Sequence, residues 1–191
     1  MNLTNDPSEL DSLIRRALSS LYEELAVCDW YVREHEVVNL FVSGHLLSTR
    51  DLDPRQVAIE GPVLKVLETD GEKLGVRKDV VVWRTPNTTL WKSCPTNERL
   101  NNDARLRFGS RPYAIIEWKN ISGVTKGPSR VLREHAGDIR WLITNTKAGM
   151  MVVGFAVLVD QSHRPVITAT KIVAGVASPF MTLPQAAAAT P

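Results

Sequence analysis

Two charged residues stand two positions apart in an otherwise largely apolar stretch, RPYAIIEWKN, at residues 111–120. Side chains alternate along a β-strand, so Glu117 and Lys119 would project from the same face as Ile115. Burying a carboxylate or an ammonium is costly unless the charge is paired or binds a metal, and these two neighbours satisfy each other only in part. The stretch therefore predicts either an ion pair on an exposed strand face or a site with chemistry.

A third charge lies in another apolar strand, RKDVVVW, at residues 77–83. If the two strands are antiparallel neighbours, Asp79 lies close to Glu117. Converging carboxylates repel each other, and a divalent cation such as Mg²⁺, which prefers oxygen ligands, removes that repulsion. Beside such a cation, Lys119 could orient or help to deprotonate a water, or stabilise charge on a phosphate. These residues favour a metal site.

RKDVVVW followed by AIIEWKN resembles the PD-(D/E)XK nucleases of the restriction-endonuclease-like superfamily, over about residues 30–160. In that family an aspartate on one strand precedes an acidic-x-lysine motif on the next, and a helix and a parallel strand follow. Asp79, Glu117 and Lys119 match these positions. The resemblance implies that Asp79, Glu117 and the backbone carbonyl of Trp118 bind Mg²⁺, for which Mn²⁺ can substitute, and that Lys119 assists the reaction.

Many members of the family also present a glutamate from an early helix, and REHEVVNLF at residues 33–41 is similar to that element. Helical geometry displaces Glu34 and Glu36 about equally from the centre of the apolar face, so both stay candidates. The apolar residues that follow Glu34 favour it as the further catalytic and metal-binding residue. The chain departs from the family pattern at Lys78, where the motif's name places a proline.

We expect a single α/β domain with a restriction-endonuclease-like mixed β-sheet flanked by helices. An amphipathic helix, introduced by Asp6-Pro7, occupies residues 1–29, and the nuclease-like domain spans 30–180. Within that domain the expected elements are a helix over 30–47, strands over 74–84 and 111–120, a helix over 128–145 and a buried strand over 149–160, with a last strand or edge near 166–176. The polar stretch at about 85–110 is an insertion, and residues 181–191 form a disordered tail.

Basic residues cluster in and after the insertion and at the start of the later helix, where they suit contacts with phosphates. The alternative is a solvated surface, since acidic residues dilute the charge and a net charge of +2 does not by itself imply nucleic-acid binding. The candidate nucleic-acid-binding residues are Arg99, Arg105, Arg107, Arg111, Lys126 and Arg130.

The sequence thus predicts a cytoplasmic, Mg²⁺-dependent endonuclease or exonuclease that acts on nucleic acid, with DNA favoured. Sequence specificity would come from the insertion, a homodimer or a partner protein. The alternative is a catalytically inactive module of the same fold that binds nucleic acid or a protein. No paired histidines or cysteines suggest zinc, no nucleophile-elbow or Walker pattern occurs, and no run of eighteen apolar residues suggests a membrane span or a membrane partner.

Overall fold

A computed structural model describes residues 2–27, 32–64, 75–86, 112–122 and 127–184, which form one mixed α/β fold. The strands are β1 (Val57–Leu64), β2 (Gly75–Val82), β3 (Ala114–Ile121), β4 (Val153–Asp160), β5 (Val166–Val173) and β6 (Val176–Leu183). The helical elements are α1 (Asp11–Val27), α2 (Glu34–Asn39), the π-helical η1 (Leu40–Leu46), the short 3₁₀ turn η2 (Pro54–Gln56) and α4 (Pro128–Lys147). None of the helices among the described residues is both long and apolar enough to span a membrane.

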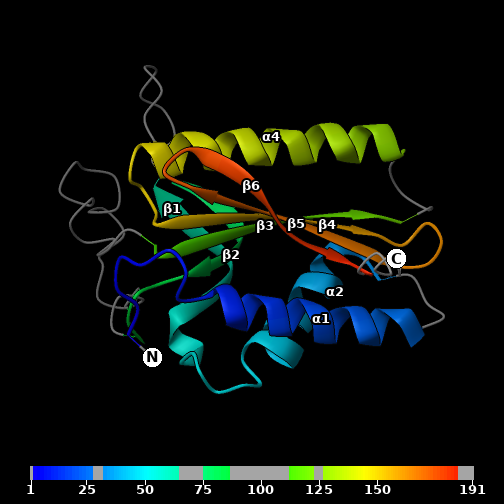
Figure 1. The fold of residues 1–191 in the computed structure, drawn as a ribbon, viewed down its shortest axis with the longest axis horizontal. Coiled ribbons are helices and arrows are strands. Elements are labelled where there is room, and N and C mark those ends of the chain that lie inside the picture. The colour runs from blue at the N-terminus through cyan, green and yellow to red at the C-terminus, as the bar shows by residue number, and fades with distance from the viewer. Residues whose placement is uncertain (1, 28–31, 65–74, 87–111, 123–126, 185–191) are drawn as a thin grey trace, which may run out of the picture.

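The six strands form one sheet whose spatial order follows the chain. Neighbouring strands are antiparallel except β3 and β4, which run parallel and are connected through α4. Figure 1 shows the resulting layers, with α4 along one face of the sheet and α1 and α2 along the other. The expected mixed sheet flanked by helices, including the helix and parallel strand after the E-x-K motif, is confirmed at this level.

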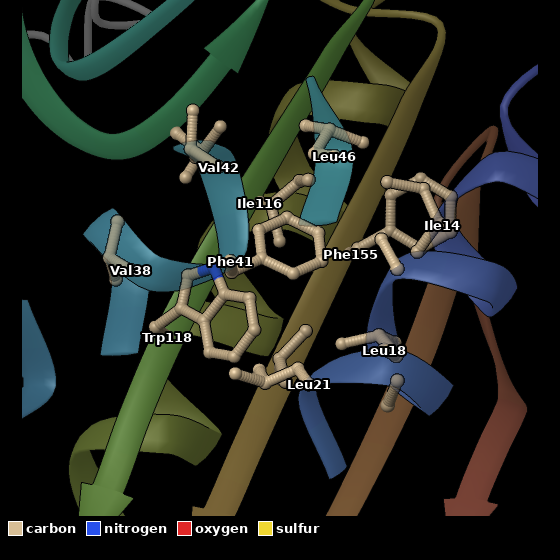
Figure 2. Close-up of a cluster of buried hydrophobic side chains, with 14 of the residues drawn as sticks. Ile14, Leu18, Leu21, Val38, Phe41, Val42, Leu46, Ile116, Trp118 and Phe155 are labelled. Carbon is tan, nitrogen blue, oxygen red and sulfur yellow. The ribbon is translucent and has the colours of Figure 1, made fainter. Parts of the chain in front are cut away.

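The two faces of the sheet bury different sets of residues. Ile116 and Trp118 of β3 pack in the cluster that includes α1 and η1, and the rings of Phe41 and Trp118 lie 4.8 Å apart (Figure 2). Ile115 packs in the opposite cluster, which includes Leu142 of α4. Because side chains alternate, burial of Trp118 toward α1 directs Glu117 and Lys119 toward α4.

The early helix differs from its prediction in its second half. The amide of Leu47 donates to the carbonyl of Val42 at 2.9 Å, a five-residue spacing that defines a π turn. The wider turn shifts the apolar face, so that Leu46 is buried and Gly44 is exposed. A regular helical period could not predict this shift.

The boundaries of other elements also differ from those predicted from the sequence. The expected tail from residue 181 begins inside β6, so residues 181–183 belong to the sheet, and β6 itself was not predicted. Residues 7–10 form a turn, and α1 starts at Asp11. In α4, Val131 is buried, whereas Leu132 is 49% exposed. Residues 87–110 of the insertion lie outside the described residues.

Two glycines give a matched test of the contact between α4 and the sheet. A Cβ at Gly154 of β4 would lie 2.9 Å from Cδ2 and 3.2 Å from Cβ of Leu142, whereas one at Gly137 of α4 would meet nothing closer than 3.9 Å. Gly154→Ala should lower the free energy of unfolding by about 1–3 kcal/mol through overpacking. Gly137→Ala should raise it by about 0.5–1 kcal/mol through helix propensity. Urea unfolding measures both, and equal values for the two variants would contradict the described packing.

Candidate active site

Asp79 lies where the ladder between β2 and β3 ends. Val80, Val81 and Val82 pair with Ile116, Ile115 and Ala114, so the strands are the antiparallel neighbours that the sequence analysis assumed. Beyond this register, Oδ2 of Asp79 accepts the backbone N–H of Trp118 at 2.7 Å. The carboxylate of Asp79 thus accepts a hydrogen bond from the main chain, as a backbone carbonyl would in a regular ladder. This bond fixes Asp79 beside the E-x-K segment.

Asp79 and Glu117 lie close to each other where the ladder between β2 and β3 ends. Ile115, two residues before Glu117, belongs to the cluster that faces α4, and alternation along β3 places Glu117 on that side. Asp79 approaches it from β2, just beyond the last paired residue Val80. The charge of Asp79 also contributes to raising the pKa of the Glu117 carboxyl. The two acidic groups therefore converge, as the sequence predicted.

Glu117 is the deepest charge of the site, with 4% of the residue exposed. Its Oε1 forms an ion pair with the ammonium of Lys78, not with Lys119 as its position in the strand suggested. Burial raises the pKa of Glu117 from its ordinary value of 4.5 to about 7; Lys78 opposes this rise, whereas Asp79 and Asp138 add to it. Burial therefore favours the protonated form of Glu117 more than in an exposed glutamate, and the ion pair with Lys78 offsets part of this effect.

Lys119 is held by oxygens from three elements. Its Nζ donates to the carbonyl of Trp118 at 2.6 Å, and it lies 3.1 Å from Oδ2 of Asp138 and 3.7 Å from Oε1 of Glu34. Burial lowers the pKa of Lys119, but the carboxylates of Glu34, Asp138 and Asp79 outweigh it and raise the pKa above its ordinary value. Lys119 is therefore an ammonium at neutral pH.

The structure separates the two glutamates of the early helix. Glu34, the first residue of α2, reaches Lys119, whereas Oε2 of Glu36 accepts the backbone N–H of Arg33 at 2.7 Å as part of a capping box. Glu36 thus satisfies the start of the helix, and Glu34 is the one beside the site.

A hydrogen-bonded group fixes the chain that enters α2. Nε2 of Gln161 donates to the carbonyl of Val32 at 3.1 Å and to Oδ1 of Asn120 at 2.8 Å, and Nδ2 of Asn120 donates to the same carbonyl. Asn120 lies near the end of β3, and Gln161 follows β4 directly. These two side chains, which the sequence analysis did not select, tie the start of α2 to the parallel strand pair and so hold Glu34 in place.

Three further residues of the site were missed from the sequence. Asp138 and Trp141 are spaced i, i+3 on α4, and the ring of Trp141 lies 3.6 Å from Nζ of Lys78. His135 lies one turn earlier, and burial lowers its pKa although Asp138 opposes this effect. The signal that could have identified Asp138 was an aspartate next to Ile139, which packs against the core cluster between α4 and the sheet.

Most of the predicted nucleic-acid-binding residues, namely Arg99, Arg105, Arg107, Arg111 and Lys126, lie outside the described residues. Arg130, in the first turn of α4, is described. Its Nε lies 2.9 Å from Oε1 of Glu134, and its side chain is 62% exposed. Arg130 is therefore an exposed cation in an i, i+4 ion pair with Glu134.

Lysine amines lie among the carboxylates of the site. Lys119 stands beside both Glu34 and Asp138, and Lys78 contacts Glu117. Within the described part of the chain, no three His, Cys, Asp or Glu side chains are grouped closely enough to hold a metal ion as they stand. A cation that used these carboxylates would have to displace at least one amine.

No protein-family model matches this chain, and no curated protein or solved structure matches it either. Functional inference therefore depends on the contacts among these residues and on the motif order in the sequence.

The buried carboxyl of Glu117 predicts a pH-dependent stability. Its pKa is raised in the folded protein, so between the unfolded value of 4.5 and about 7 the folded state binds more protons, and the free energy of unfolding falls as pH rises. From about pH 5 to about pH 8, metal-free wild type should lose roughly 2–3 kcal/mol relative to Glu117→Gln. Denaturant unfolding across this range measures the difference, and parallel curves for the two proteins would contradict the raised pKa.

Proposed function

We propose that this chain is a Mg²⁺-dependent nuclease of the PD-(D/E)XK type, with a restriction-endonuclease-like fold, that hydrolyses phosphodiester bonds, with DNA the favoured substrate. One observation carries the proposal. Asp79 and Glu117 converge from adjacent antiparallel strands where their ladder ends, and Lys119 lies on the same strand as Glu117. A helix and a parallel strand then follow in the order that the resembled family has.

The oxygens available at the site suit a hard cation. The carboxylates of Asp79 and Glu117 and the carbonyl of Trp118 are all oxygen donors, the type that Mg²⁺ and Mn²⁺ bind. Oε1 of Glu117 is buried, and the ammonium of Lys78 occupies it. A divalent cation held there would polarise the phosphate and lower the pKa of a bound water.

The ammonium of Lys119 would stabilise the negative charge that builds on the phosphate when a water oxygen attacks phosphorus and the bond to the leaving oxygen breaks. Because its pKa is raised, Lys119 is poised to act as a cation and a hydrogen-bond donor, not as the base that accepts the proton of the water. Glu34 and Asp138, which come from helices on opposite faces of the sheet, would act as positioning residues that hold this ammonium.

The alternative is a non-catalytic module that binds nucleic acid or a protein. The contacts of the lysines favour it, since Lys119 covers the carbonyl of Trp118 and Lys78 neutralises Glu117 without any metal. Measurement of Mn²⁺ binding separates the two functions. A nuclease requires that wild type binds Mn²⁺ and that Asp79→Asn abolishes this binding. The non-catalytic module does not require Mn²⁺ binding.

The two glutamates of α2 provide a matched test of the site. Glu34→Gln should lower the rate of Mg²⁺-dependent cleavage of supercoiled and single-stranded DNA by roughly 10–100-fold, because it removes one partner of Lys119. Glu36→Gln, two residues away, should change the rate less than twofold, about 0.4 kcal/mol in the activation barrier. Asp79→Asn serves as the inactive reference. A larger loss for Glu36→Gln than for Glu34→Gln would contradict the assignment.

Asp138→Asn tests the positioning role on α4. The variant keeps the shape of the side chain but removes its charge, so kcat should fall roughly 10-fold or more with little change in KM. Because Asp138 helps to raise the pKa of Lys119, the basic limb of the pH–rate profile should also move to lower pH. A fall in kcat with an unmoved profile would indicate a structural role only.

A further inference from the structure

Lys78 is unusually buried for a lysine side chain. It precedes Asp79 in β2, its side chain is 11% exposed, and its ammonium lies between Oε1 of Glu117 and the ring of Trp141. A buried ammonium needs a counter-charge, and Glu117 supplies it. The same oxygen is one that the proposed metal would need.

Resting on the proposed function, we propose that Lys78 is an intramolecular competitor of the metal ion, occupying Glu117 in the resting protein and leaving when a divalent cation binds. An ammonium and a divalent cation repel each other, and both are attracted to the same carboxylate oxygen. Lys78 therefore sets how much free metal is needed to load the site. This role differs from that of Lys119, which contacts Glu34, Asp138 and the carbonyl of Trp118.

Trp141 offers Lys78 a second contact beside that with Glu117. Its ring face lies 3.6 Å from Nζ of Lys78, close enough for a cation–π contact that does not require Glu117. The lysine stem is long and flexible, so the ammonium can withdraw from the carboxylate past the edge of the ring toward solvent. The competitor therefore stays tethered and returns to Glu117 when the metal leaves.

The neighbouring Arg77 offers a matched control. Its side chain is 78% exposed and pairs with Glu60 of β1, away from Glu117. Lys78→Met and Arg77→Met remove the same unit of charge from adjacent positions of β2, but only the first removes the partner of Glu117. Any general effect of net charge on cation binding appears in both variants.

The affinity of the full chain for Mn²⁺, measured by calorimetry and by electron paramagnetic resonance without substrate, tests the proposal. Lys78→Met should bind Mn²⁺ roughly tenfold or more tightly than wild type, because a like charge beside the cation is gone. Lys78→Arg, which keeps the charge, should not bind more tightly than wild type, and Arg77→Met should lie within about twofold of it. Equal or weaker binding by Lys78→Met, while wild type binds Mn²⁺, overturns the role of Lys78 and leaves the proposed function intact.

A second measurement on wild type does not depend on the folding of a variant. Acylation of lysine amines, read by mass spectrometry, should label Lys78 several-fold faster with Mg²⁺ than without it, with exposed Lys147 as the internal reference. Unchanged labelling at a Mg²⁺ concentration that saturates the site overturns the proposal. If wild type and Lys78→Met both fail to bind Mn²⁺ and fail to cleave DNA, the proposed function falls as well, and the two failures are thus distinguishable.

Discussion

The buried charge of Glu117 is the constraint around which the site is arranged. A carboxylate that is 4% exposed in the middle of a sheet cannot rely on water, so its surroundings must supply the balancing charge. Lys78 supplies it in the metal-free protein, while Asp79 and Asp138 oppose ionisation. A second lysine, Lys119, balances the remaining acids. The arrangement stabilises the fold poorly, since removing charges from water is expensive, and such cost is typical of sites kept for chemistry.

The backbone explains why these charges meet. Antiparallel pairing of β2 with β3 brings Asp79 to the E-x-K segment, and the parallel crossover to β4 places α4 over the same face, which adds Asp138 and Trp141. Burial of the Trp118 side chain on the opposite face, against Phe41, fixes which way Glu117 and Lys119 point. The rigid core therefore sets the direction of the polar groups, and their mutual contacts set the final positions.

Period-two alternation and motif order were enough to predict β2, β3, the later helix, the parallel strand, and the convergence of Asp79 with Glu117. They could not identify the partner of each charge, because pairing across strands and helices depends on local geometry. Lys78 pairs with Glu117 beyond the point where the regular ladder ends at Val80, and Asp138 reaches the site from α4, far along the chain from β2 and β3. The π turn after α2 and the strand β6 were likewise hidden, since neither has a distinctive period in the sequence.

Anomalous diffraction from crystals soaked in Mn²⁺ tests most directly whether these acids bind a divalent cation. The proposed function predicts a peak about 2.0–2.2 Å from oxygens of Asp79 and Glu117, with the Trp118 carbonyl turned to it and the amine of Lys119 withdrawn from that carbonyl. A soaked structure with no peak between the two acids, and with Lys78 still paired to Glu117, would contradict the account.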